Sequence, residues 1–403
     1  EDEAIEAANK FEKVSWNIAF KKIVEQINKT SSEKIAGLTG DLTNMETLYI
    51  VKEFFNKTIK SKNLDSRSDN YYINTKDRRN YIFNSTLNGI EDSDLIILVG
   101  TNPRYEATIL NARIRKSFLK NNSDIYSFGN VGDLTYPYNI IENNTEEIKK
   151  IFENKSQLSE KIKNSNKPII IIGQSLLKQK SGGYVFEEFK KYLISQNKFT
   201  DEWNSLNILS QNASTVGSYD LDIVNQTNDN NETLKKIQDN QFDVLFLIGQ
   251  DNLKFNKKNE FIIYIGSHGD NGAEKADVIL PGSTYIEQDG YFTNLEGKIQ
   301  KAYKASYPPG DAKEDWQIVN ELSELLKRKK LYKNKDELVD SMLNYLNLNT
   351  KNNKEPIIKE FISEKINVDK IDYYYSNVIS RSSKTMTDCR NEKIKLNKTG
   401  TEG

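Results

Sequence analysis

The sequence is poor in the two side chains that most often bind redox metals. It contains one cysteine, Cys389, and one histidine, His268, among its 403 residues. One thiol cannot close an internal disulfide, and it cannot hold an iron–sulfur cluster, which usually takes several cysteine ligands. A single histidine nearly excludes a histidine-based zinc site. We therefore expect no iron–sulfur cluster and no metal site within this chain.

Long apolar runs and an excess of one charge are also missing. No apolar run approaches the ~20 residues of a membrane-spanning helix. The 57 basic and 58 acidic residues nearly cancel, so the clustered basic surface that nucleic-acid binding needs is not expected. In contrast, 17 Phe, 21 Tyr and several runs rich in Ile, Val and Leu argue for a packed core rather than disorder. A chain of this length predicts roughly two or three packed units.

Short apolar segments that end in glycine or a turn recur along the chain. They are Ile35–Gly40, Leu95–Gly100, Asp124–Gly129, Pro168–Gly173, Val244–Gly249, Phe261–Gly266 and Val278–Leu280. Such continuous runs are typical of strands buried on both faces of a parallel sheet. Helix-like stretches lie between them: Leu42–Lys60, Tyr105–Leu119, Gly183–Gln196 and Glu232–Gln238. The alternation of strand and helix predicts an α/β fold built from doubly wound units.

The same pattern divides the chain into five expected segments. They are 1–33 (an N-terminal helix), 34–141 (a first α/β unit), 142–167 (a linker), 168–310 (a second α/β unit) and 311–403 (a C-terminal helix and docking tail). Apolar residues at three- and four-residue steps predict the first helix over Glu3–Lys29. The polar linker is expected to hold one helix, Glu146–Phe152, and Tyr307–Gly310 is a strong turn signal before a helix over Asp311–Lys327.

Residues that could line a ligand crevice follow the predicted strands. In open α/β sheets, ligands bind outside the carboxyl ends of the strands, where glycine lets a backbone approach closely. Gly100, Asn102 and Gly249 stand at such junctions. None of these junctions is a G-x-G-x-x-G fingerprint or a phosphate loop. They are compatible with a nucleotide or pterin crevice, and equally with the ordinary turns of the fold.

His268 and a loop of mixed polar residues are further candidates. His268 follows the predicted strand Phe261–Gly266 and could act as an acid, a base or a ligand. A hydrogen bond within its loop is the plainer interpretation, because the chain has no second histidine. The loop EQDGYFTNLEGKIQ contains Asn294 and a carboxylate pair, Glu287 and Asp289, that could do acid/base work. Nothing in the sequence fixes the separation of that pair.

The C-terminal stretch ISRSSKTMTDC is the last candidate. Arg381 and Lys384 could bind a phosphate or the carboxylates of a partner. Cys389 would need a base to act as a nucleophile, and the histidine is remote in sequence. The plainer interpretation is a basic, polar segment that docks on this protein or on a partner.

Taken together, these segments resemble one superfamily, the molybdopterin-dinucleotide oxidoreductases. Val14–Ile27 is similar to its SW-x-x-A helix start, Gly100–Pro103 to its G-x-N-P turn, and Ala276–Gly282 with Glu287–Gln300 to its ADVVLP … E-x-x-G-x-x-x-N-x-E-G-R-x-Q stretch. Lys298 stands where arginine is common. Within the superfamily, the strongest resemblance is to the large iron–sulfur subunits of respiratory complex I. Their H-H-G-D-x-G-A turn resembles Ser267–Ala273, and their terminal S-R-A-S-x-T-M-A-x-C resembles Ser380–Cys389.

This resemblance implies two Rossmann-like units of the molybdopterin oxidoreductase type and a scaffold function. The clusters of that family lie in an N-terminal ferredoxin-like region that is absent here. Iron–sulfur clusters are therefore expected on a partner polypeptide of a split subunit, or on the rest of a longer protein. The resemblance implies a vestigial crevice, whose residues now only shape turns: Gly100, Asn102, Gly249, His268 and Asn294. It also implies that no residue of this chain is catalytic, binds a cofactor or binds a metal.

The implied function is that of a structural subunit in the NADH-oxidising peripheral arm of complex I. Such a subunit supports electron transfer from NADH to ubiquinone without binding a redox centre itself. Its expected place is the matrix side of the mitochondrial inner membrane, where it is peripheral and has no direct membrane span. The expected partners are the other peripheral-arm subunits, above all the polypeptide that carries the iron–sulfur clusters, and no nucleic acid.

The sequence does not exclude two other functions. An active molybdopterin oxidoreductase domain, similar to formate dehydrogenase, would need bound pterin and a cluster-bearing partner, and no residue stands out as its metal ligand. An unrelated α/β nucleotide-binding enzyme, such as the central domain of a thiamine-diphosphate enzyme, would share the glycine-terminated strands. The metal motif and catalytic glutamate of that class are not recognisable here.

Overall fold

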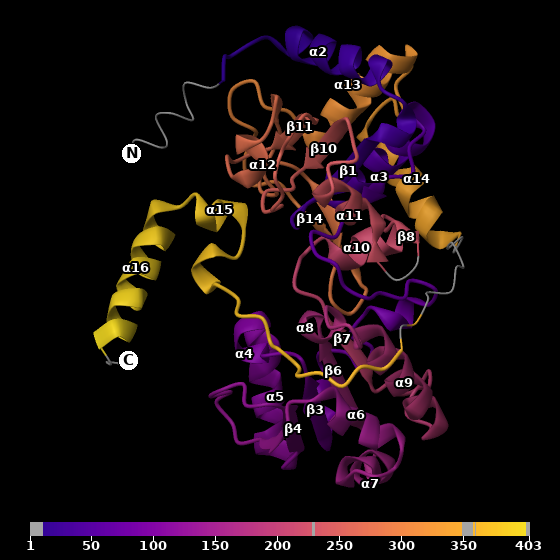
Figure 1. The fold of residues 1–403 in the computed structure, drawn as a ribbon, viewed down its shortest axis with the longest axis vertical. Coiled ribbons are helices and arrows are strands. Elements are labelled where there is room, and N and C mark those ends of the chain that lie inside the picture. Colours follow the sequence, from indigo (N-terminus) through magenta and orange to yellow (C-terminus); the bar gives the residue numbers. More distant parts are fainter. Residues whose placement is uncertain (1–10, 228–229, 349–357, 359, 400–403) are drawn as a thin grey trace.

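The computed structural model describes residues 11–227, 230–348, 358 and 360–399, and within these two five-stranded parallel sheets form the body of the protein. Figure 1 shows one α/β unit above the other. The upper sheet, sheet 1, has the strand order β12-β11-β10-β1-β2, and the lower sheet, sheet 2, has the order β5-β4-β3-β6-β7. The predicted doubly wound α/β fold is confirmed.

Seven of the ten strands in these two sheets lie at or close to the predicted apolar runs. Sheet 1 consists of β1 (Ile35–Thr39), β2 (Leu64–Asp65), β10 (Val244–Ile248), β11 (Phe261–Gly266) and β12 (Val278–Pro281). Sheet 2 consists of β3 (Leu95–Val99), β4 (Asp124–Phe128), β5 (Asn139–Ile141), β6 (Pro168–Gly173) and β7 (Leu206–Leu209). Strands β2, β5 and β7 were not predicted.

The pairing of the strands differs from the expected division into consecutive units. β1 lies between β10 and β2, with Ile35 opposite Val244, so sheet 1 joins the start of the chain to its later part. Sheet 2 is formed within 95–209: β3, β4 and β5 come from the predicted first unit, 34–141, and β6 and β7 come from the predicted second unit, 168–310, with the predicted linker, 142–167, between them. The sheet 2 unit is therefore inserted into the sheet 1 unit. Apolar runs mark strands, but pairing depends on tertiary packing that the runs do not encode.

The predicted linker is also more structured than expected. It contains two helices, α6 (Thr145–Phe152) and α7 (Gln157–Asn164). Their apolar faces, including Ile148, Ile151 and Ile162, are completely buried in the core of the sheet 2 unit. The many Asn, Glu and Lys residues of this stretch lie on the opposite faces, which is why the composition suggested a linker.

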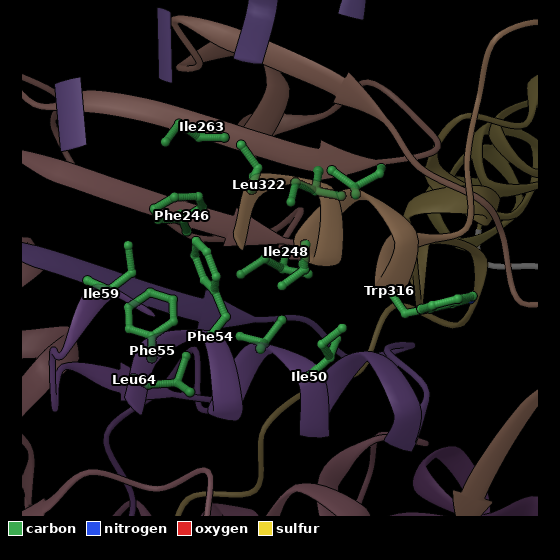
Figure 2. Packing of buried hydrophobic residues seen from close by; sticks show 14 of the residues in the cluster. Ile50, Phe54, Phe55, Ile59, Leu64, Phe246, Ile248, Ile263, Trp316 and Leu322 are labelled. Atoms are coloured by element: carbon green, nitrogen blue, oxygen red, sulfur yellow. The ribbon is translucent and has the colours of Figure 1, made fainter. Parts of the chain in front are cut away.

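Helices cover both faces of sheet 1. Alternate residues of β10 enter different cores: Phe246 and Ile248 face one, and Leu245 and Leu247 face the other. The first core is covered by α2 (Trp16–Lys29), α3 (Met45–Glu53) with a π-helical turn (Phe54–Ile59), α13 (Asp315–Lys327) and α14 (Lys335–Asn347). Figure 2 shows Phe54, Phe55 and Leu322 converging on β10 from these helices. The second core includes α11 (Glu232–Gln238).

Sheet 2 is covered in the same way. One face packs against α6, α7, α8 (Gln174–Leu177) and α9 (Gly182–Ser195), and the other against α5 (Thr108–Asn121), which follows α4 (Pro103–Glu106). A separate antiparallel hairpin, β13 (Gly290–Thr293) and β14 (Ile299–Ala302), packs on α3. Short elements complete this part: α10 (Thr215–Asp220), α12 (Asn271–Glu274) and the pair β8 (Gln226–Thr227) and β9 (Asn230–Asn231).

The two ends of the chain depart most from expectation. The N-terminal helix was predicted from Glu3, but α2 begins at Trp16, residues 11–15 are not helical, and the start of the prediction lies outside the described residues. At the other end, residues 360–381, here called the strap, run along both units and include α15 (Val378–Arg381). Helix α16 (Lys384–Thr399) follows and extends away from the body in Figure 1. Across the described part of the chain, every helix is too short or too polar to span a bilayer.

Candidate functional site

The glycines predicted to line a crevice lie at the carboxyl ends of the two central strands. Gly100 follows β3 and Gly249 follows β10, with left-handed φ angles of 62° and 60°. Each is packed against a second glycine on the neighbouring strand. A Cβ atom on Gly173 would lie 2.2 Å from the Gly100 carbonyl oxygen, and one on Gly40 would lie 1.6 Å from that of Gly249. Backbone geometry therefore requires glycine at both pairs of positions, whether or not a ligand binds.

Asn102 lies beside Gly100, and its polar groups are used within the protein. Its side-chain amide donates to the Val131 carbonyl oxygen at 2.8 Å, and its Oδ1 accepts from the Arg104 amide at 3.1 Å, which caps α4. The carboxylate of Glu106 accepts from the Asn102 backbone amide at 2.7 Å. Burial raises the pKa of Glu106. Asn102 thus shapes the turn after β3.

His268 lies at the carboxyl end of β11, the strand next to β10. Its Nδ1 is 2.9 Å from the hydroxyl of Ser267, and its backbone carbonyl accepts from the Tyr264 hydroxyl at 2.8 Å. The side chain is half-buried. The structure therefore brings His268 to the same sheet edge as Gly249 and gives it hydrogen bonds within its own loop.

The other predicted polar residues lie in the hairpin region. Asn294 is in the turn between β13 and β14, where its Oδ1 accepts from the Lys298 amide at 2.9 Å. Glu287 accepts from the Thr284 amide and Asp289 accepts from the Lys304 amide, each at 2.9 Å. Each of these side chains holds a backbone turn in place. The two carboxylates are engaged with separate backbone segments rather than with each other.

A cluster of carboxyl groups at the carboxyl end of sheet 1 was not predicted. Asp41 follows β1, Asp251 follows β10, Asp270 follows β11, and Asp315 begins α13 behind β12. Burial raises the pKa of Asp41 to about 6 and the pKa values of Asp251 and Asp315 to about 7. The sequence did contain a signal for two of them, since the segments TGD and IGQD place an acid one or two residues after the glycine that ends a strand.

The cluster has hydrogen-bond partners from several elements. The Tyr264 hydroxyl donates to Asp251, and burial raises the pKa of Tyr264. The Asn212 side-chain amide donates to Asp41 at 2.7 Å. The Ser283 backbone amide donates to Asp315 at 3.2 Å. These neutral donors hold the carboxyl groups in place without compensating their charge.

The cation near the cluster comes from the strap. Arg381 Nε lies 2.5 Å from Asp270 Oδ2. Its charge lowers the pKa of Asp41 and of Asp251, although burial outweighs it at both residues. The sequence suggested that Arg381 could bind a phosphate or the carboxylates of a partner, or that its segment docks on this protein or on a partner. The structure supplies a carboxylate of this chain. Lys384 forms an exposed pair with Asp388, and Cys389 is exposed.

The chemistry of this edge does not match a phosphate-bearing pterin. Phosphates are bound by cations and by free backbone amides at helix starts. Here carboxyl groups crowd the edge of sheet 1, and the cations Arg381 and Lys178 already pair with Asp270 and Asp369. Over the residues that the structure describes, no group of three or more His, Cys, Asp or Glu side chains is arranged to hold a metal ion. The edge suits a positively charged group rather than an anionic cofactor.

Comparison with solved structures gives a distant likeness that concerns the fold. A chain of the formyltransferase/hydrolase complex of Methylorubrum extorquens superposes with a TM-score of 0.55 at 11% identity, covering 78% of this chain and 97% of that one. Its likeness supports the arrangement of the two α/β units.

Comparison with known sequences gives closer relatives. The NADH-ubiquinone oxidoreductase 75 kDa subunit of Reclinomonas americana is 34% identical over 412 residues, covering 96% of this chain and 59% of the relative. The NADH-ubiquinone oxidoreductase 78 kDa subunit of Candida albicans is 32% identical, covering 96% of this chain and 55% of the relative. This chain thus spans somewhat more than half the length of these relatives. The family pattern of molybdopterin oxidoreductases matches residues 5–325, so the chain belongs to the molybdopterin oxidoreductase family.

Proposed function

We propose that this chain is a structural part of the NADH-oxidising peripheral arm of respiratory complex I. The observation that carries the proposal is the 34% identity to a 75 kDa NADH-ubiquinone oxidoreductase subunit, which extends over 96% of the chain. Similarity along nearly the whole chain favours a shared place in an assembly over a shared fold alone. In this function the chain supports electron transfer from NADH to ubiquinone but performs no step of it.

We further propose that the chain works without a pterin cofactor. The supporting observation is the charge at the carboxyl end of sheet 1, where Asp41, Asp251, Asp270 and Asp315 gather. Burial already raises the pKa values of Asp41, Asp251 and Asp315, and each of these carboxyl groups that ionised would repel a pyrophosphate placed there. The alternative, an active oxidoreductase similar to formate dehydrogenase, would need this edge to be positively charged.

The iron–sulfur clusters of the assembly would lie outside this chain. The chain covers 55–59% of the length of its relatives and has a single cysteine. A partner polypeptide, or the rest of a longer protein, would carry the cysteine ligands. The Candida albicans relative is described as mitochondrial. We accordingly propose a peripheral position on the matrix side of the mitochondrial inner membrane.

Native purification tests this proposal. The full chain would be tagged in its own cells and purified under mild detergent, and the particle would be resolved on a native gel stained for NADH-dependent tetrazolium reduction. We expect the chain to migrate with an NADH-oxidising, iron-containing particle that also contains a cysteine-rich polypeptide. A tagged unrelated mitochondrial protein is the control. Recovery of the chain in a particle without NADH-oxidising activity would contradict the proposal.

A further inference from the structure

The strap crosses the carboxyl ends of both sheets. In Figure 1 it passes along the sheet 2 unit below α8 and then rises to α15, which lies beside the sheet 1 unit. Asp369 of the strap donates its backbone amide to the hydroxyl of Ser175, directly after β6, at 3.0 Å. Arg381, at the other end, contacts Asp270, which lies in the loop after β11, just before α12. One segment therefore covers the sheet edges at which ligands bind in folds of this kind.

The first part of the strap is fixed on the sheet 2 unit by several hydrogen bonds, by a buried side chain and by the ion pair between Lys178 and Asp369. The Thr145 amide donates to the Glu364 carbonyl oxygen at 3.0 Å, and the Glu364 amide donates to the Thr145 hydroxyl at 2.9 Å. The Ser181 amide donates to the Glu364 carboxylate at 2.7 Å. Ile366 is completely buried in the core of this unit. Backbone pairing with a buried apolar anchor keeps this part in place without depending on a single ion pair.

The far end of the strap is held by charge. Arg381 and Asp270 are each about one-fifth exposed, at 20% and 18%, and their contact is a charge-assisted hydrogen bond. Around Arg381 the body of the protein presents Asp41, Asp251 and Asp270, with Tyr264 hydrogen-bonded to Asp251. Val378 of α15 is also buried, at 7% exposure, so the far end of the strap has an apolar contact as well as this ion pair.

Arg381 also makes a hydrogen bond within the C-terminal part of the strap. Its Nη1 donates to the Tyr375 carbonyl oxygen at 3.3 Å. Asn377 and Ser380 form a capping box at the start of α15, so the turn that presents Arg381 is a defined unit. Helix α16 packs on this turn region and otherwise extends away from both sheets in Figure 1. Movement of Arg381 would therefore move α15 and α16 together.

We propose that the strap is a latch, fixed on the sheet 2 unit through residues 360–369 and closed reversibly over the sheet 1 carboxylates by Arg381. Closed, it covers the edges of both sheets and neutralises part of the acidic cluster. Open, it exposes Asp41, Asp251 and Asp270 and frees α15 and α16. The site under the latch then accepts a guanidinium or another organic cation, such as an arginine side chain of a neighbouring polypeptide. This inference concerns contacts within the chain and holds whichever complex the chain joins.

Hydrogen exchange of the full chain, followed by mass spectrometry, tests the latch. We expect Arg381→Gln to speed exchange about tenfold over residues 373–383, since a charge-assisted hydrogen bond is lost. Residues 360–369 should keep their protection. Asp270→Asn should reproduce the effect from the other side of the contact. Lys384→Gln is the matched control, because it removes one positive charge three residues away and breaks only the exposed pair with Asp388.

Chemical rescue separates a latch from a simple loss of stability. In Arg381→Ala, millimolar ethylguanidinium should restore protection of residues 373–383 towards the wild-type level, and ethylammonium should restore less because it lacks the planar fork. Two results would overturn the proposal. One is unchanged exchange over residues 373–383 in both Arg381→Gln and Asp270→Asn. The other is an equal rise over residues 360–369, which would show that the strap leaves as one piece.

Discussion

The two α/β units have the same architecture but different edges. Each has a five-stranded parallel sheet in which two adjacent inner strands end in a touching glycine pair, Gly40 with Gly249 and Gly173 with Gly100. Beyond these pairs the units diverge. The sheet 1 edge carries four carboxyl groups, whereas the turn after β3 in sheet 2 combines the neutral side chain of Asn102 with one carboxylate, that of Glu106. The fold therefore requires glycine at these positions, but it does not determine which side chains lie at the carboxyl end of each sheet.

The units also differ in how the chain builds them. Sheet 2 comes from one continuous stretch, 95–209, whereas sheet 1 must bring β1 and β10 together from distant parts of the chain. Sheet 1 depends on long-range pairing and is closed by C-terminal elements, including α13 and Arg381 of the strap. Bringing distant segments together costs more conformational entropy, because a longer loop must be closed. We therefore expect substitutions and pH to change the stability of the two units differently.

The largest expected effect tests the feature that the units share. Gly40→Val and Gly173→Val should each destabilise the protein by about 3 kcal/mol or more, because the new side chain would overlap a backbone carbonyl. Denaturant unfolding measures the loss. Gly269→Ala is the control, since its added methyl meets open space. If either valine variant unfolded like the wild type, the shared glycine contact would be refuted for that sheet.

The next effect is confined to the sheet 2 unit. Ile366→Ala should cost about 3 kcal/mol, because it leaves a cavity at a completely buried position. Ile362→Ala, in the same strap, removes the same atoms from a side chain that is 44% exposed and should cost less than about 1 kcal/mol. Thermal unfolding of both variants measures the difference. Equal losses would mean that the strap has no preferred anchor.

A pH dependence should distinguish the sheet 1 edge. The pKa of Asp251 is raised by burial to about 7, so the folded state binds a proton that the unfolded state releases near pH 4. Its contribution to stability is present below about pH 4 and is lost as the pH rises through about 7. In Asp251→Asn, the free energy of unfolding should fall less between pH 5 and pH 8 than in the wild type. The midpoint of denaturant unfolding, measured across this pH range, checks this. An unchanged pH profile in this variant would contradict a buried, protonated Asp251.

The smallest effect is expected outside both sheets. Asn294→Ala should cost about 1 kcal/mol, because it removes the side-chain acceptor that holds the β13–β14 turn. Asn294→Asp, which keeps an acceptor oxygen, is the control and should lose less. Circular dichroism during thermal unfolding measures both. A loss of several kcal/mol would instead assign Asn294 a place in the core.

The sequence predicted those features that depend on local pattern. Apolar runs located β10, β11 and β6 within one residue, and α11 has the predicted bounds, Glu232–Gln238. The sequence did not predict β2, β5 and β7, because they are short or contain polar residues such as Asn207. It also did not predict the strand pairing or the insertion of one unit into the other, because parallel pairing joins segments that lie far apart in the sequence.

The candidate site was predictable only in part, for the same reason. Gly100 and Gly249 were identified because a glycine after a buried strand is a local signal. The acidic cluster was missed because Asp41, Asp251 and Asp270 follow different strands, and they meet only through the order β11-β10-β1. Once the order is known, their convergence follows from the common direction of parallel strands.

We propose that this chain uses a molybdopterin oxidoreductase fold as a scaffold without the cofactor. The most direct measurement is the content of molybdenum, tungsten, iron and extractable pterin in the native particle, normalised to this chain. We expect no molybdenum, tungsten or pterin, with iron present in proportion to the cluster-bearing partner in an NADH-oxidising particle. About one molybdenum or tungsten with pterin per chain would contradict it, and would make the crevice around Gly100, Gly249 and His268 an active site.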